Sequence, residues 1–138
     1  MEKVPLKETR MSVEHFTSDD ASTWFQRLDQ QIFLADVLAQ DSGAAMSVGF
    51  ARYGKGEKNP WKMTYDEALV ITSGVFTVEG PSGSVTARAG EVIYLRSGAE
   101  VVYVAEEDTE LVYVTHPHWL AATESSIEAH RLDDFHEA

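Results

Sequence analysis

Residues 60–74 read Pro-Trp-Lys-Met-Thr-Tyr-Asp-Glu-Ala-Leu-Val-Ile-Thr-Ser-Gly, with large side chains at every second position. In an extended chain, one face carries Trp61, Met63, Tyr65, Glu67, Leu69 and Ile71. Such alternation predicts a β-strand with one buried face. Glu67 is the only charged member of that face, so we expect its carboxyl group to point into an apolar interior. Burial disfavours the ionised form, so its pKa should rise unless a partner compensates.

The composition restricts the class of protein. A chain of 138 residues suits one domain with a single core, and 43% hydrophobic residues argue against disorder. The absence of cysteine excludes disulfides and thiolate sites. A net charge of -12 argues against nucleic acid or an anionic membrane as partner. No apolar run is long enough to span a membrane and the N-terminus lacks a signal core, so we expect a cytoplasmic protein.

Short strands separated by turn residues are predicted on both sides of this stretch. They cover residues 31–38, 46–53, 75–80, 84–88, 92–95, 101–104 and 111–114. Residues 54–60 are predicted to form a loop. This regular spacing is typical of an all-β sandwich or barrel.

The two ends of the chain show other patterns. Residues 13–16 fit a short strand, residues 17–20 fit a helix start, and Trp24, Phe25 and Leu28 form an apolar stripe at helical spacing. A short helix is predicted over residues 119–129, followed by a frayed acidic tail at 133–137. We divide the chain into an N-terminal arm, residues 1–16, and one domain with a helical C-terminal tail, residues 17–138.

Two glycine-containing patterns resemble the motifs of the cupin superfamily. Glu67, six residues and Gly74 are similar to the end of the first motif. The start of the second motif is similar to a pattern formed by Gly90, Arg96 and Gly98, in which five residues separate the first two and one residue separates the last two. Arg96 stands where proline is usual in this motif. The chain most resembles the ethanolamine-utilisation (EutQ-like) group, over roughly residues 30 to 120. The segments that carry this resemblance are Gly49-Phe50, Pro60-Trp61, Tyr65-Asp66-Glu67, Gly90-Glu91 and Tyr113-Val114-Thr115, with Pro117 and Trp119.

The resemblance implies a single cupin domain, a jelly-roll β-barrel or sandwich with short flanking helices. It also implies a homodimer, often formed in cupins by exchange of N-terminal strands. Most enzymatic cupins hold a metal with three histidines and a glutamate, and these positions fall on Trp61, Met63, Glu67 and Val101. One carboxylate beside Trp, Met and Val side chains cannot hold a first-row cation. We therefore expect no metal and no other cofactor.

The buried face supplies the candidate catalytic residues. Glu67 is a candidate general acid or base, although a neighbouring tyrosine or backbone amide would equally satisfy a carboxyl group without function. Tyr65 lies two residues before Glu67, and Tyr103 lies two residues after Val101. Both are predicted to donate hydrogen bonds to a substrate or to Glu67. Buried tyrosines also serve as ordinary core residues.

The remaining candidates are for binding. The predicted small-molecule site contains Trp61, Met63, Val101 and Tyr113, although Met63 also fits ordinary core packing. Three lysines, Lys55, Lys58 and Lys62, would suit an anionic group near the mouth or form a solvated loop. The pair His116 and His118 has metal-site spacing, but Pro117 interrupts it, which favours loop histidines.

Three functions remain open from the sequence. The first is a metal-independent dehydratase, isomerase or lyase in which Glu67 and Tyr65 move a proton on a small polar metabolite. The second is a non-catalytic module that binds a small ligand, tied by resemblance to an amine-utilisation pathway. The third is a metallo-cupin that recruits His116 or His118. An acetate-kinase-like activity is implied for part of the ethanolamine group, but neither a nucleotide site nor a Mg²⁺ site is visible in the sequence.

Overall fold

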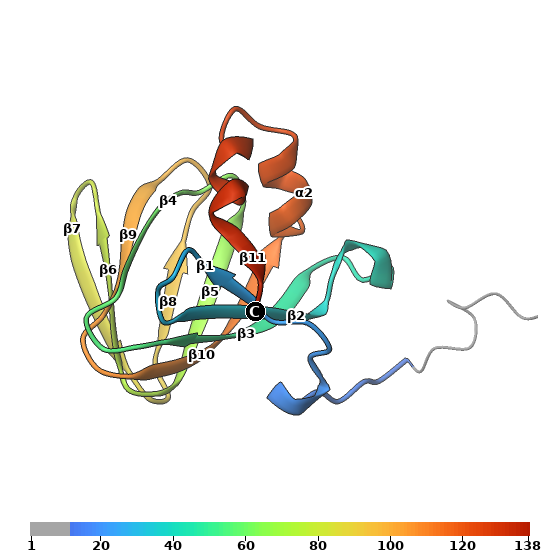
Figure 1. The fold of residues 1–138 in the computed structure, drawn as a ribbon, viewed down its shortest axis with the longest axis horizontal. Helices are drawn as coiled ribbons and strands as arrows, with labels where there is room; N and C mark the ends of the chain where they lie inside the picture. Colours follow the sequence, from blue (N-terminus) through green and yellow to red (C-terminus); the bar gives the residue numbers. More distant parts are fainter. Residues whose placement is uncertain (1–11) are drawn as a thin grey trace, which may run out of the picture.

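Two antiparallel β-sheets dominate the structure, a computed structural model that describes residues 12–138 (Figure 1). The larger sheet contains β1 (Phe25–Arg27), β2 (Ile32–Leu38), β3 (Ser47–Tyr53), β5 (Asp66–Ser73), β8 (Val92–Leu95), β10 (Thr109–His116) and β11 (Phe135–Glu137). Its strand order is β11-β1-β2-β3-β10-β5-β8. The smaller sheet contains β4 (Lys58–Lys62), β6 (Val75–Gly80), β7 (Gly83–Arg88) and β9 (Glu100–Ala105), in the order β4-β9-β6-β7. The predicted all-β class is confirmed.

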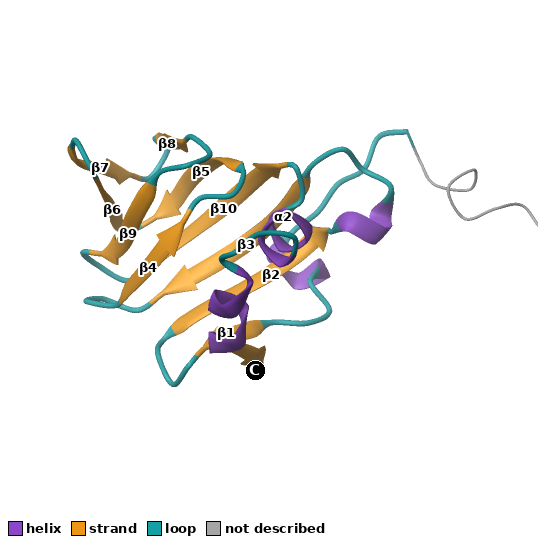
Figure 2. Ribbon diagram, turned by 90° about the horizontal axis from the view of Figure 1, so that it is seen from above, coloured by secondary structure: helices purple, strands orange, loops and turns teal. Residues whose placement is uncertain are grey.

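The core lies between the two sheets, which form the two layers seen in Figure 2. Ile71 and Leu111 reach it from the larger sheet, and Phe76 and Tyr103 reach it from the smaller one. The Phe76 ring packs edge-on against Tyr53 of β3, with ring centroids 4.9 Å apart. Each inner face supplies alternate residues of its strands, as expected for a sandwich.

Residues 60–74 pass from one sheet to the other instead of forming one strand. β4 ends at Lys62 in the smaller sheet, and β5 begins at Asp66 in the larger one. The Met63 N–H donates to the Ala99 carbonyl (2.9 Å), and the Gly98 N–H donates to the Met63 carbonyl (2.8 Å), which fixes the crossing. Burial still alternates, since every second residue from Trp61 to Ile71 is at most 6% exposed. The predicted inward row is therefore confirmed, although two sheets share it.

The predictions for the N-terminal part of the domain are wrong in two places. Residues 13–16 form no strand, and the helix begun at Thr17 stops after one 3₁₀ turn, η1 (Ser18–Asp20). Trp24–Leu28 is not helical, because residues 25–27 form β1 between β2 and β11. Strand pairing outweighs local helical spacing here. The predicted exchanging arm falls largely on residues 1–11, which lie outside the described residues.

Two further segments pair with strands that are distant in sequence. Residues 58–60, predicted as loop, begin β4, which tolerates Pro60 because it is an edge strand. The predicted frayed tail forms β11, which pairs with β1. The helix predicted at 119–129 is shorter than expected, because α2 (Trp119–Glu124) ends at Glu124. A separate 3₁₀ helix, η3 (Ala129–Asp134), follows, and both lie over one end of the sandwich (Figure 1). Another 3₁₀ turn, η2 (Gln40–Ser42), follows β2.

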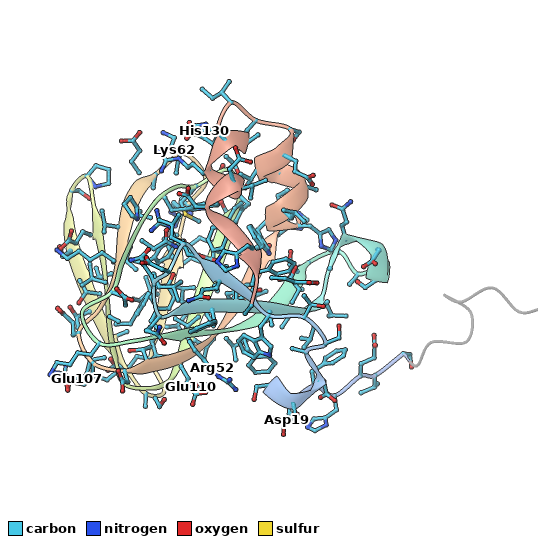
Figure 3. The ribbon with its side chains drawn as sticks, in the orientation of Figure 1. Asp19, Arg52, Lys62, Glu107, Glu110 and His130 are labelled. Atoms are coloured by element: carbon cyan, nitrogen blue, oxygen red, sulfur yellow. The ribbon has the colours of Figure 1, made fainter. Side chains whose placement is uncertain are left out.

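The side chains labelled in Figure 3 lie on the outside of the sandwich. Arg52 pairs with Glu110 on the neighbouring strand, at 3.2 Å. Lys55 pairs with Glu107 at 3.0 Å, whereas Lys62 lies at the opposite end, near the C-terminal helices. The predicted lysine group is therefore not one cluster. None of the helices within residues 12–138 is long and apolar enough to cross a membrane.

Gly49 permits one close approach between side chain and backbone. It lies on β3 between Asp36 of β2 and Tyr113 of β10. A Cβ atom at Gly49 would collide with the Tyr113 ring and come within 2.7 Å of the Ala35 carbonyl oxygen. The Tyr113 ring crosses this position, and its hydroxyl donates a hydrogen bond to Asp36 Oδ1.

We predict that Gly49→Ala destabilises the protein by about 1–3 kcal/mol, as overpacking does. Urea unfolding measures this change. Gly80→Ala is the matched control, because the nearest atom to an added Cβ there is the Gly83 carbonyl oxygen at 3.6 Å. Equal stabilities for the two variants would contradict the close approach.

Candidate functional site

A small cavity lies between the sheets, on the inward side of β5. Its volume is about 40 Å³, enough for about three water molecules. Aromatic side chains form most of its wall: Tyr53, Trp61, Tyr65, Phe76, Tyr103, Tyr113, Trp119 and Phe135. The other lining residues are Leu34, Ala51, Asn59, Glu67, Leu69 and Leu111. The lining thus contains one carboxyl group and no basic side chain.

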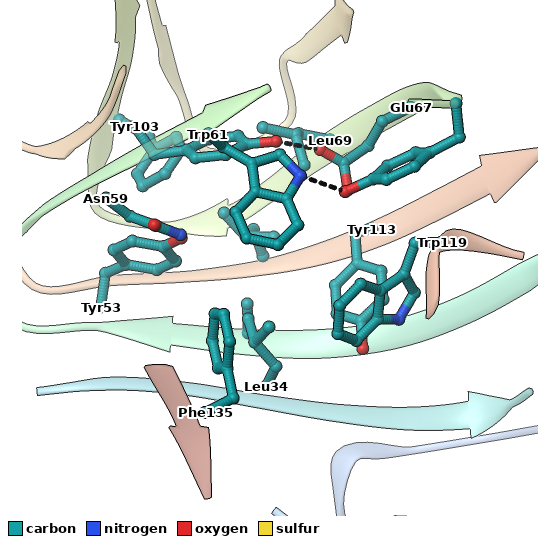
Figure 4. A pocket seen from close by; sticks show the side chains of 14 residues that line it. Leu34, Tyr53, Asn59, Trp61, Glu67, Leu69, Tyr103, Tyr113, Trp119 and Phe135 are labelled. Carbon is teal, nitrogen blue, oxygen red and sulfur yellow. Dashed lines mark hydrogen bonds between the residues drawn. The ribbon is translucent and has the colours of Figure 1, made fainter. Parts of the chain in front are cut away.

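Glu67 points into this cavity, as the alternation predicted (Figure 4). Its side chain is 6% exposed, and the Tyr103 hydroxyl donates to Oε1 at 2.7 Å. Burial raises the pKa of Glu67 from 4.5 to about 7, and the hydrogen bond from Tyr103 opposes that rise. A carboxyl group with a pKa near neutrality can both accept and return a proton at physiological pH.

The two predicted tyrosines hold different positions beside Glu67. Tyr103 donates its single proton to Glu67, while its oxygen lies 3.4 Å from the Met63 sulfur. The Tyr65 hydroxyl accepts a hydrogen bond from Trp61 Nε1 at 2.8 Å (Figure 4). Burial raises the pKa of both hydroxyls well above 10, so both keep their protons. Tyr65 therefore retains a proton with which to donate a hydrogen bond to a bound molecule.

Three aromatic rings meet at one side of the cavity and cover it. Trp61 lies 6.4 Å from Trp119 and 6.0 Å from Phe135, measured between ring centroids. Trp119 begins α2 and Phe135 begins β11, so the C-terminal segment supplies two of the three rings. A molecule larger than a few atoms must displace part of this cover to reach Glu67.

Asp36 holds the cover in place. Its Oδ1 accepts hydrogen bonds from the Tyr113 hydroxyl and from Trp119 Nε1, the latter at 3.0 Å. Partial burial raises the pKa of Asp36, and these two hydrogen bonds oppose the rise. Asp36 thus joins the inner strand β2 to the start of α2.

Asn59 contributes an unsatisfied polar atom to the cavity wall. Its side chain is 4% exposed, and its Nδ2 donates to the Tyr53 hydroxyl at 3.2 Å. Within residues 12–138, Asn59 Oδ1 is the one buried side-chain polar atom with no hydrogen-bond partner. Buried polar atoms in native proteins nearly always have a partner, so this oxygen needs an explanation.

The side chains at the usual cupin metal positions do not fit a metal. Glu67 offers one carboxylate, Val101 offers no donor atom, and the Trp61 indole nitrogen donates its hydrogen to Tyr65. Across residues 12–138, no group of three or more histidine, aspartate or glutamate side chains is arranged to hold an ion. The His116 and His118 rings lie beside the carbonyls of Ala45 and Ala44 instead.

The structure brings most of the predicted residues together. Glu67, Tyr65, Tyr103, Trp61 and Tyr113 all line the cavity. Met63 and Val101 are buried, at 1% and 7% exposure, but they do not line it.

Sequence reasoning missed Asn59, Tyr53, Asp36, Trp119 and Phe135. Extending the alternation backwards from Trp61 reaches Asn59, and a lone acid in the apolar run 31–38 marks Asp36. No local signal marks Phe135, because its place depends on pairing with β1.

The sequence of this chain is similar to one protein family and to two curated proteins. The family model described as "Ethanolamine utilisation protein EutQ" matches residues 7–121. Acetate kinase EutQ of Escherichia coli K12 is 26% identical over 103 residues, which cover 72% of this chain and 44% of that protein. The chain therefore spans less than half the length of the curated relatives it matches.

Solved structures share the fold of this chain. A Rhizobium leguminosarum protein of unknown function is 29% identical, with a TM-score of 0.65 over 78% of this chain and all of that one. The Clostridium difficile EutQ protein is 20% identical, with a TM-score of 0.65 over 75% of this chain and 73% of that one. Cupin superfamily structures also share the fold.

We predict that burial of Glu67 makes the protein less stable as pH rises. The unfolded state loses this proton near pH 4.5 and the folded state near 7, so stability falls between these values and is level above them. At about 1.4 kcal/mol per pKa unit, the loss is on the order of 3 kcal/mol. Glu67→Gln should remove this loss.

Urea unfolding at about pH 5 and about pH 8 tests the prediction. The exposed carboxylate Glu100 gives the matched control Glu100→Gln, which should behave like the wild type. The same pH dependence in Glu67→Gln and wild type would show that another group causes it.

Proposed function

The chain belongs to the EutQ family of cupins, and from this premise we propose that it is a metal-independent enzyme that moves a proton on a small polar metabolite. The observation that carries this proposal is Glu67, a buried carboxyl group with a pKa of about 7 at the wall of a cavity. Perturbed carboxyl groups of this kind are typical of acid–base catalysis. The reaction class is dehydration, isomerisation or β-elimination.

In this mechanism, ionised Glu67 accepts a proton from a carbon atom of the substrate. The Tyr65 hydroxyl donates a hydrogen bond to the substrate oxygen on which negative charge develops. Glu67 then returns the proton to another atom of the same molecule or to a leaving group. Tyr103 stays bonded to Glu67 and lowers its pKa from the still higher value that burial alone would give.

Substrate entry requires movement of the aromatic cover. The cavity volume of about 40 Å³ is smaller than a typical metabolite site. Trp119 and Phe135 are only half-buried and come from short terminal elements. Displacing these two side chains therefore costs less free energy than displacing the rest of the wall. Closure over a bound substrate would exclude water from Glu67.

Two other chemistries fit the cavity less well. A metallo-cupin reaction lacks a suitable donor set around Glu67, as described above. The curated relatives are named acetate kinases, and phosphoryl transfer needs cationic groups or Mg²⁺ around the phosphates. The Glu67 cavity has no basic lining residue, so we assign it proton transfer and not phosphoryl transfer.

A non-catalytic ligand-binding module in an amine-utilisation pathway is the second candidate. The observation in its favour is the aromatic wall with few polar groups, a composition typical of small-molecule sites. This candidate uses the same cavity but requires no proton transfer by Glu67.

We predict that the protein catalyses exchange of a substrate C–H proton with solvent, and that Glu67→Gln slows this exchange at least about 100-fold. Proton NMR in D₂O, run against a panel of small hydroxy, keto and amino compounds, detects the loss of the C–H signal. For a compound that exchanges, the rate should rise tenfold per pH unit below about 7 and level off above, because only ionised Glu67 is a base. Tyr103→Phe should move this midpoint upward, since it removes the hydrogen bond that opposes the rise in pKa.

Glu100→Gln is again the control and should leave the exchange rate unchanged. If a panel compound binds to both the wild type and Glu67→Gln, and neither protein exchanges its C–H protons, the enzyme is rejected in favour of the binding module. Exchange that persists in Glu67→Gln would reject Glu67 as the base.

A further inference from the structure

We infer that the cavity takes a small primary ammonium compound, whose ammonium group donates to Asn59 Oδ1 while the rest of the molecule extends toward Glu67. The inference rests on the proposed function in using the same cavity, and it names the class of molecule that the cavity selects. Asn59 is then a binding residue that the acid–base chemistry does not itself require.

The first support is the unsatisfied oxygen of Asn59. Its amide nitrogen is engaged by Tyr53, so the free group is a buried acceptor on a residue of the cavity wall. Leaving a buried acceptor unpaired is unfavourable, and a ligand N–H group would satisfy it. Figure 4 places Asn59 and Tyr53 on one side of Trp61 and Glu67 on the other, so the two acceptors lie apart. A ligand can therefore engage Asn59 and still present a second group to Glu67.

The second support is the charge of the wall. The only ionisable group of the lining that carries charge near neutral pH is Glu67, and no lysine, arginine or histidine lines the cavity. An anionic ligand would face a carboxylate with no compensating cation, which is costly in a dry site. A cationic ligand instead has a counter-charge in the same cavity, across from Asn59. The net charge of -12 on the whole chain also attracts cations.

The third support is the aromatic wall at the Asn59 end. The rings of Tyr53 and Tyr103 lie 6.5 Å apart between centroids, and Trp61 lines the same cavity. Aromatic faces attract cations through the ring quadrupole, more strongly where water is excluded. An ammonium group beside Asn59 would have these rings around it.

The cavity volume limits the size of the molecule. A volume of about 40 Å³ accommodates about three non-hydrogen atoms while the cover is closed. Ligands this small bind no tighter than about millimolar. Ethylammonium is therefore a suitable probe, with ethanol as the neutral analogue and acetate as the anionic one.

Titration of ¹⁵N-labelled protein with ethylammonium chloride at constant ionic strength and about pH 8.5, where Glu67 is ionised, tests the inference. Saturable shifts are expected for the indole N–H signals of Trp61 and Trp119. Trp24, which lies against Arg52 outside the cavity, should not respond and is the internal control. Ethanol should bind at least about tenfold more weakly, acetate should not bind, and ethylammonium should bind at least about tenfold more weakly at about pH 5.5.

Two substitutions at Asn59 identify the role of its oxygen. Asn59→Ala should weaken ethylammonium binding at least about tenfold, whereas Asn59→Asp keeps an acceptor and should retain binding. Glu100→Gln should leave the affinity unchanged. If either Asn59 variant fails to fold, the wild type still tests the ligand class. The measurements are the pH dependence of ethylammonium binding and the order of affinity of the three probes.

Preference for acetate, equal response to ethanol and ethylammonium, or no saturable response to ethylammonium would overturn the inference. None of these results bears on proton exchange by Glu67, which the deuterium experiment measures separately. Failure of that exchange with ethylammonium still bound would reject the proposed enzyme and leave the ligand class standing.

Discussion

The central constraint is a carboxyl group that the fold buries with a single hydrogen bond. Glu67 is 6% exposed and receives one donor, the Tyr103 hydroxyl. An ionised carboxylate in such a site normally needs several donors or a cation, and the lining supplies no basic side chain. Because burial disfavours the ionised form, the pKa of Glu67 is raised to about 7. Both the reactivity proposed for Glu67 and the preference for a cation follow from this imbalance.

The fold creates this constraint by passing one inward row through two sheets. Residues 61–71 keep their alternation while the chain crosses from β4 to β5, so Glu67 cannot turn outward without exposing Tyr65 and Leu69. Gly49 leaves room for the Tyr113 ring, and Asp36 fixes Tyr113 together with Trp119. The cavity is thus built from the rigid sheets, whereas its cover belongs to the terminal segment.

Local pattern in the sequence predicted the inward row and most strands between residues 31 and 114. Period-two alternation placed Tyr65 and Glu67 in the interior, and the turn residues placed the hairpins from Val75 onward. The resemblance to cupins located Val101, and hence Tyr103 on the facing strand. β1 and β11 were missed, because a three-residue strand has no pattern of its own and depends on a partner about 110 residues away. Asn59 was missed for a different reason, since Pro60 and the neighbouring glycines made an edge strand look like a loop.

Both proposals depend on a buried Glu67 that exchanges its proton with solvent near neutral pH. Carbon-13 NMR of protein labelled at the glutamate side-chain carboxyl, assigned with Glu67→Gln, measures that titration directly. We predict one glutamate signal with a titration midpoint at about 7, which is missing from the variant. A titration midpoint near the ordinary value of 4.5 would contradict this prediction. Glu67 would then be ionised at neutral pH, which would mean that hydrogen-bond donors or a cation stabilise its carboxylate.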